Sequence, residues 1–213
     1  MNGLLDAWRT ALPVSVPVGA AHRAGEQLLA RWGEPQRHYH TVDHLAAVLH
    51  VVDEHHHLAA DPDVVRLAAW FHDAVYNPHR VDNEEASALL AEATLPELHV
   101  GPARVAEVAR LVRLTAGHDP APGDHNGGLL TDADLAILAS RPEVYRAYTV
   151  AVRREYAHVP DTAFAAGRGA VLENLLSLPR LYHCRQLRER WEATARHNLA
   201  TELTLLRTTH PCA

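Results

Sequence analysis

The chain has 213 residues, of which 47% are hydrophobic, which is enough for one globular domain with a sizeable core. Its formal net charge is -6, and this balance disfavours a role as a nucleic-acid scaffold, which would require a basic face. All 20 basic residues are arginines, whose planar guanidinium suits phosphate oxygens, so a local arginine cluster around a small phosphorylated molecule stays open.

The N-terminal stretch is not expected to be a signal peptide or a membrane span. The N-terminal stretch MNGLLDAWRTALPVSVPVGAAH has no basic leader, and Pro13 and Pro17 interrupt its apolar residues. Cys184 and Cys212 are too few and too far apart for a disulfide framework. We therefore expect a cytoplasmic protein without a membrane span.

Apolar residues recur at helical spacing along the whole chain, whereas strand-like alternation does not persist. Thr41 and Asp61 are expected N-caps, and Pro62 is expected at a first helical position. The residues between 117 and 128 are rich in Gly, Pro and Asp and are expected to form a long loop. Helices are expected over about residues 3–12, 18–32, 41–59, 61–77, 82–93, 101–116, 129–140, 141–157, 161–178 and 183–207. The pattern predicts one all-α domain of nine or ten helices.

The 17 histidines need sorting, because few of them lie in apolar surroundings. The run His55, His56 and His57 falls at a helix end, where solvent exposure or a favourable interaction with the helix dipole explains it. His197 is expected to be a buried hydrogen-bonding residue. His72 and Asp73 differ, since they interrupt the apolar run LAAWFHDAV. An unpaired buried charge is costly, so Asp73 needs a partner, either a bonded neighbour or a divalent cation shared with His72.

Two further segments place histidine or aspartate, both common metal ligands, in apolar surroundings. His40 and His44 can share one helical face if the helix begins by His40, and His44 falls on the apolar stripe with Val48 and Leu49. The segment LLTDADLAIL adds Asp132 and Asp134 without a local basic partner. One metal site explains all three segments together.

These motifs resemble those of the HD superfamily, which consists of all-helical, metal-dependent phosphohydrolases named after a His-Asp pair. The matching pieces are YHTVDH, AAWFHDAVY, DNEEASA, DADLAILA, VRREYAHVP, GRGAVL and ARHNL. YHTVDHLAAV is also similar to an element of the cyclic-nucleotide phosphodiesterases. The resemblance implies a single HD-type domain with N-terminal helices at 1–35, a metal core at about 36–140 and C-terminal helices at 141–213.

The resemblance also implies roles for individual residues. His44, His72, Asp73 and Asp134 match the metal ligands, with Asp132 as a rival to Asp134 about 200° round the same helix. His40 matches the histidine that protonates the leaving oxygen, and Asp73 can orient or deprotonate the attacking water. The cation can be Mn, Mg, Co, Ni, Zn or Fe. His118 is a candidate for a second metal or for a substrate contact.

The remaining candidate substrate contacts have simpler explanations as well. Arg153 and Arg168 can meet phosphoryl charge, or they can form salt bridges to Glu155, Glu173 or Glu192. Glu84 can line the pocket, or it can complement a helix dipole in a segment that Asp82 and Asn83 cap.

The expected activity is therefore hydrolysis of a phosphate ester or nucleotide by metal-activated water. A di-iron oxygenase of the HD type is the alternative if His118 and a further histidine build a second site. A non-catalytic ligand-binding HD module is the third possibility. The expected partner is a small phosphorylated molecule, with no role at a membrane. The long final helix can pack on the core or on a second subunit, so a homodimer stays open.

Overall fold

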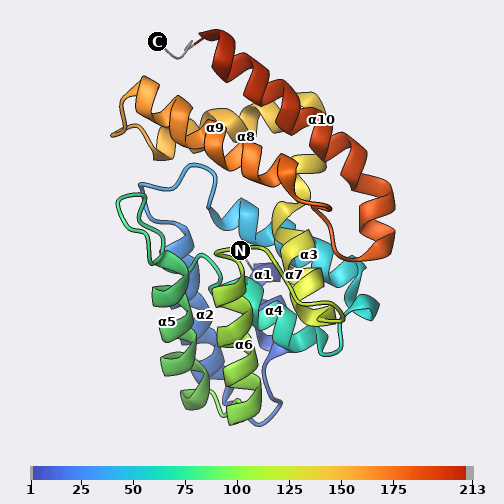
Figure 1. Cartoon of the computed structure of the whole chain (residues 1–213). Helices are drawn as coiled ribbons and strands as arrows, with labels where there is room; N and C mark the ends of the chain where they lie inside the picture. The colour runs from blue at the N-terminus through green and yellow to red at the C-terminus, as the bar shows by residue number, and fades with distance from the viewer. Residues whose placement is uncertain (1, 210–213) are drawn as a thin grey trace. The chain divides into compact units, whose positions relative to one another are not determined.

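The computed structural model describes residues 2–209, so Cys212 lies outside the described range. Within that range the chain forms ten α-helices, two short 3-10 helices (η1 and η2) and no strand, which confirms the prediction of an all-α fold with nine or ten helices (Figure 1). The elements are α1 (Asn2–Ala11), α2 (Val18–Trp32), α3 (Val42–Glu54), η1 (His56–Leu58), α4 (Pro62–Phe71), α5 (Asn83–Glu97), α6 (Pro102–Leu114), α7 (His125–Asp134), η2 (Leu135–Ala139), α8 (Pro142–Glu155), α9 (Asp161–Ser177) and α10 (Arg185–Thr209).

The described residues form two compact units that divide between Ala133 and Asp134. The boundary falls in the last turn of α7, so Asp134 ends a helix whose earlier residues all belong to the first unit. The expected single domain, with parts at 1–35, about 36–140 and 141–213, stays a prediction.

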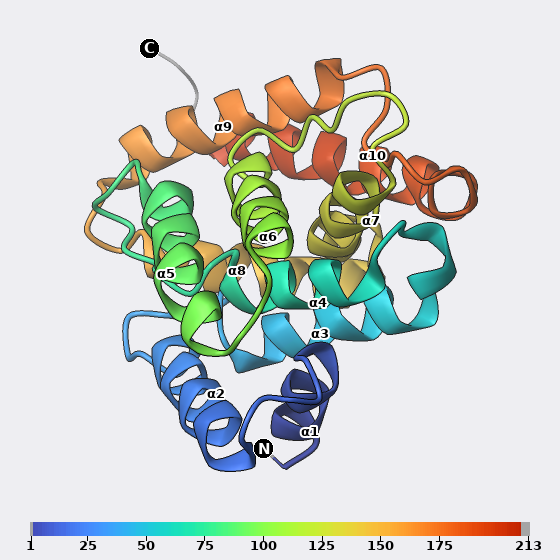
Figure 2. The same ribbon diagram turned by 90° about the horizontal axis from the view of Figure 1, so that it is seen from below.

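Helix α4 is the centre of the first unit and packs against α1, α3, α5 and α6 (Figure 2). Val64, Val65 and every residue from Leu67 to Phe71 are buried, which explains why this stretch is apolar on all faces. Trp8 from α1 and Trp32 from α2 pack against its C-terminal half, where Trp70 lies. The rings of Trp8 and Trp70 lie 5.3 Å apart, and the Trp32 indole N–H donates to the Trp70 carbonyl over 3.0 Å.

The start of α4 follows the sequence prediction, but its end does not. The Asp61 carboxylate accepts a hydrogen bond from the Val64 N–H over 3.2 Å, and Pro62 takes the first helical position. The helix then ends at Phe71 rather than near residue 77, because the Ala74 N–H turns back to the Phe71 carbonyl. Apolar residues continue past the helix end, and a buried turn cannot be told from a buried helix by apolarity alone.

Helix α7 begins inside the segment that was predicted to be a loop. The Asp124 carboxylate accepts a hydrogen bond from the Gly127 N–H over 2.8 Å, and Arg110 holds the same carboxylate. This capping interaction starts the helix at His125, although two successive glycines disfavour a helix there. After Asp134 the chain continues as the 3-10 helix η2, so the expected single helix over 129–140 is in fact two elements.

In the second unit, α10 packs against α9 and η2. The core includes Leu138, Leu172, Tyr182 and Leu199. In the ARHN motif the buried polar residue is Asn198, which donates to the carbonyls of Leu138 and Ser140 over 2.8 and 2.9 Å. The expectation that His197 is buried is wrong, because its side chain faces solvent.

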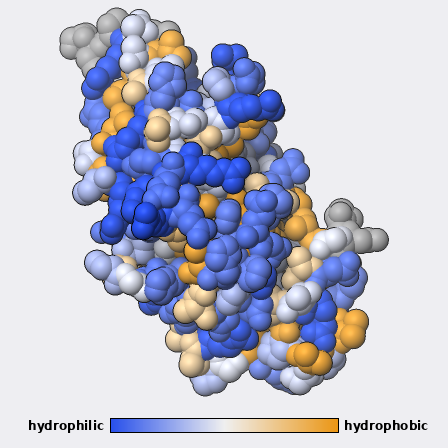
Figure 3. Space-filling view, turned by 90° about the vertical axis from the view of Figure 1, so that its right-hand side faces the viewer, coloured by the Kyte–Doolittle hydropathy of each residue, from blue (hydrophilic) through white to orange (hydrophobic). Residues whose placement is uncertain are grey.

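No helix within residues 2–209 has the length and apolarity needed to cross a bilayer. The face in Figure 3 is mostly hydrophilic, and its apolar residues form small, separate groups. The most exposed large apolar side chains, Val14, Val18 and Val81, are valines outside the helix interiors.

Candidate metal centre

Two buried histidines from different helices bring their ring nitrogens together. His44 lies in the first turn of α3, and His72 directly follows α4. Their Nε2 atoms are 3.2 Å apart, and the two residues are 6% and 1% exposed. His44 points inward with Leu45, Val48 and Leu49, as the apolar stripe of α3 indicated.

A backbone hydrogen bond determines the tautomer of His72. Its Nδ1 lies 2.8 Å from the Ala69 carbonyl oxygen, which can only accept, so Nδ1 carries the proton. The Nε2 lone pair is then directed toward His44, which is the arrangement that a histidine ligand of a metal requires. The Trp32 ring packs beside the imidazole at 5.3 Å and limits its rotation.

Carboxylates complete the group. The ligand atoms of His44, His72 and Asp134 all lie within 4.8 Å of one another, and Asp134 is partly buried at the end of α7. Asp73 Oδ2 lies 3.2 Å from His72 Nε2 and 3.9 Å from His44 Nε2. Of the two rival aspartates, Asp134 therefore approaches the histidines, while Asp132 is fully buried and outside this group of three. Imidazole and carboxylate donors gathered in this way fit a divalent cation, so the site can hold a metal ion.

His40 reaches the same group from a loop. The helix begins at Val42 with Thr41 as its N-cap, which confirms the predicted cap. It therefore does not begin by His40, so His40 and His44 do not share a helical face. His40 Nε2 nevertheless lies 4.0 Å from Asp73 Oδ2, and its side chain is 22% exposed. Its ring packs against that of Tyr76 at 4.3 Å. His40 is thus the most accessible of the three histidines around Asp73.

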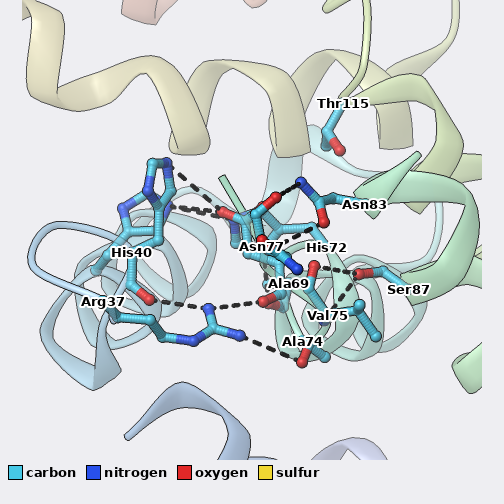
Figure 4. A network of polar contacts seen from close by, with 12 residues as sticks. Arg37, His40, Ala69, His72, Ala74, Val75, Asn77, Asn83, Ser87 and Thr115 are labelled. Atoms are coloured by element: carbon cyan, nitrogen blue, oxygen red, sulfur yellow. Dashed lines mark hydrogen bonds and ion pairs between the residues drawn. The ribbon is translucent and has the colours of Figure 1, made fainter. Parts of the chain in front are cut away.

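Sequence reasoning missed Arg37, which is almost fully buried beneath the site. Its Nη1 donates to the carbonyls of His40 and Asp73 over 2.9 and 2.8 Å, and its Nη2 lies 3.3 Å from the Ala74 carbonyl (Figure 4). The residue attracted no notice because arginine is not a metal ligand. Its position at the start of RHYHTVDH, among aromatic residues that could cover a buried guanidinium, was the available signal.

Helix α5 fixes the segment that follows Asp73. The Asn83 side chain accepts from the Asn77 N–H and donates to the Asn77 carbonyl, both over 3.0 Å, and Ser87 Oγ accepts from the Val75 N–H over 3.0 Å (Figure 4). Asp82 precedes the helix but makes no capping hydrogen bond, because its carboxylate pairs with Arg80. The arginine holds the pKa of Asp82 below its usual value. The DNEEASA motif therefore anchors the turn after the His-Asp pair.

Two of the predicted substrate contacts, Glu84 and His118, lie in the first unit. Glu84 is partly buried in the first turn of α5. His118 is partly buried beyond α6 with a left-handed φ of 51°, and its N–H donates to the Leu114 carbonyl. Their contact with a substrate stays a prediction.

Both arginine candidates lie in the second unit and have carboxylate partners there. Arg153 pairs with Asp161 over 2.6 Å, and Arg168 pairs with Glu202 over 2.7 Å and also donates to the Tyr148 hydroxyl over 3.0 Å. These partners differ from the glutamates considered in the sequence. The substrate role of the two arginines stays a prediction.

No protein-family model, curated protein or solved structure matches this chain. The function proposed below therefore rests on the residues of the site and on the resemblance of the sequence motifs to those of the HD superfamily.

Proposed function

We propose that the protein is a metal-dependent phosphohydrolase of the HD type, which cleaves a phosphate ester or a nucleotide with water. The observation that carries the proposal is the convergence of His44, His72 and Asp134 from three separate parts of the sequence, with Asp73 beside the two histidines. Each of these polar side chains loses its hydration on burial, which costs free energy. A cation bound by all of them would offset that cost.

The residues that would hold the cation are His44, His72, Asp73 and Asp134. When bound, a divalent cation supplies Lewis acidity toward a phosphoryl oxygen and makes a water molecule acidic enough to act as a nucleophile near neutral pH. Two imidazoles and two carboxylates suit Mn, Mg, Co, Ni, Zn or Fe, so the donor set selects a class of cation rather than one element.

The chain's own residues supply the proton transfers. Asp73 stands next to both ligand histidines, where its carboxylate accepts a proton from the attacking water. His40 is partly exposed and approaches the same Asp73 oxygen as the two ligand histidines, and from there its imidazolium donates a proton to the leaving oxygen of the substrate. A general acid that reaches both Asp73 and solvent suits a reaction in which the leaving group departs toward the bulk.

The substrate we propose is a small phosphorylated molecule, with a nucleotide as one member of that class. The proposed substrate contacts are Glu84, His118, Arg153 and Arg168. An arginine already paired with a carboxylate can still bind phosphate through its remaining N–H groups.

Phosphate release from a panel of nucleotides, sugar phosphates and aryl phosphodiesters tests the proposal. Turnover that disappears on chelation and returns with added Mn, Co, Ni, Zn, Mg or Fe is the expected result. The matched control is His56→Ala, which removes an exposed histidine at the start of η1 and should not alter turnover. Failure to release phosphate with any of these metals would contradict the proposal. Two iron ions per chain with consumption of O₂ would instead support the oxygenase.

A further inference from the structure

The two side chains proposed to move protons come from segments without regular secondary structure. His40 lies between the end of α2 and the start of α3, and Asp73 lies between α4 and α5. Neither segment has a ladder of helical hydrogen bonds to fix its backbone. The spacing of 4.0 Å between His40 Nε2 and Asp73 Oδ2 therefore depends on other interactions.

One buried guanidinium joins these two segments. Arg37 Nη1 donates to the carbonyls of both His40 and Asp73, which are 3 and 36 residues away in the sequence. Nη2 bonds the next carbonyl, that of Ala74, so both segments are tied to one rigid planar group (Figure 4).

The surroundings of Arg37 leave the guanidinium little freedom to move. It lies over the Trp32 ring at 5.3 Å and over the Tyr76 ring at 5.4 Å, and its Nε is 3.5 Å from a Glu34 carboxylate oxygen. The same two aromatic residues also pack against site histidines: Trp32 against His72 and Tyr76 against His40. Movement of the guanidinium would therefore disturb the site from two sides.

We propose that Arg37 is a positioning residue, which sets the relation of His40 to Asp73 by holding both backbones through Nη1. This inference rests on the proposed function, since it assigns Arg37 a role in the proton transfers of that reaction. Arg37 acts through His40 and Asp73 and not on the substrate. Its loss should therefore lower kcat while KM and metal content change little.

The first test compares Arg37→Met and Arg37→Lys with Arg66→Met as a matched control. Arg66 lies on α4 and pairs with Asp53 and Asp63. We expect Arg37→Met to lower kcat about 100-fold. Arg37→Lys should lower kcat less than Arg37→Met, because an ammonium keeps the positive charge. It should still lower kcat, because an ammonium cannot bond three carbonyls as the planar guanidinium does. A kcat for Arg37→Met equal to that of Arg66→Met would overturn the proposal.

A double-mutant cycle separates positioning from general destabilisation. Because Arg37 acts through both His40 and Asp73, adding Arg37→Met to His40→Ala should cause a clearly smaller further loss of kcat than Arg37→Met causes alone. The melting temperature of each variant shows how much folding contributes. A fully additive loss of kcat in the double variant would show that Arg37 does not act through His40.

Hydrogen–deuterium exchange tests the clamp without any substrate. In Arg37→Met the amides of residues 38–41 and 73–76 should both exchange faster, while Arg66→Met leaves both segments unchanged. Unaltered exchange in the two segments would refute the clamp. Faster exchange in a protein that hydrolyses none of the phosphate compounds would support the clamp and reject its catalytic role together with the proposed function.

Discussion

The Nε2 atoms of His44 and His72 lie 3.2 Å apart, although 28 residues separate the two histidines in the sequence. His72 already carries a proton on Nδ1, bonded to the Ala69 carbonyl, so its Nε2 offers a lone pair. Two buried ring nitrogens at this distance can share a proton or a cation. The adjacent carboxylates of Asp73 and Asp134 favour the cation.

The two aspartates of α7 should differ in their effect on metal binding. Asp134→Asn removes the carboxylate that approaches His44 and His72, so metal affinity should fall by about 10- to 100-fold or more. Asp132→Asn changes a fully buried residue outside that group and should lower stability while metal binding persists. Metal titration by calorimetry, with melting temperatures, checks both variants. If Asp132→Asn lost the metal and Asp134→Asn kept it, Asp132 would be the metal ligand instead of Asp134.

His40→Ala should separate proton transfer from metal binding. Because His40 is proposed as the general acid, its removal should reduce kcat by about 10²- to 10⁴-fold. The metal content per chain should stay that of the unaltered protein. Elemental analysis of the kinetic sample provides the check, and loss of the metal would make His40 a ligand instead.

Stability at low pH should depend on the ion pair at the start of α4. Two hydrogen bonds from Arg104 hold the pKa of Asp61 below its ordinary value of 3.8, although burial opposes this shift. The ion pair therefore stabilises the fold above about pH 4, and this contribution is lost as pH falls through the lowered pKa.

Asp61→Asn isolates that charge, because asparagine also caps helices well. The variant should be less stable than the unaltered protein at neutral pH by up to about 1 kcal/mol, since the pair is partly exposed and screened. Urea denaturation at several pH values should show this difference shrinking below about pH 4. A difference that does not depend on pH would mean that the ion pair contributes nothing.

Gly127 should tolerate no larger residue. A Cβ at this position would collide with the Asp124 carboxylate that caps α7 and would lie 2.7 Å from Leu114 Cδ2. Gly127→Ala should destabilise the protein by about 1–3 kcal/mol. Gly167→Ala is the matched control: it lies within α9 with open space around it and should stabilise by about 0.5–1 kcal/mol. Equal stability of the two variants would contradict the close packing at Gly127.

Local sequence signals predicted most of the helices, because caps such as Thr41 and Asp61 and prolines such as Pro62 act over a few residues. They failed at the end of α4 and at the start of α7. At the first of these places apolar residues continue into a buried turn, and at the second Asp124 caps a helix that contains two glycines. At the end of α4 burial outweighed the local pattern, and at the start of α7 a side-chain cap outweighed the low helix propensity of glycine.

The sequence predicted which histidines and aspartates could bind a metal, but not how they are arranged in space. His44 and His72 attracted notice because imidazoles are unusual in apolar segments, and both prove to be buried. Only the family resemblance favoured Asp134 over Asp132, since the direction of each side chain depends on where α7 ends. The contacts of Arg37 could not be predicted, because its guanidinium bonds backbone carbonyls from two distant segments.

The most direct test of the metal centre is the metal content per chain of the protein purified without added metal, measured beside His72→Ala. The unaltered protein should carry about one divalent ion, or take one up from a metal-containing buffer, because its ligand atoms already converge. His72→Ala should bind none. A protein that stays metal-free at neutral pH, or a His72→Ala variant that keeps its metal, would contradict the account.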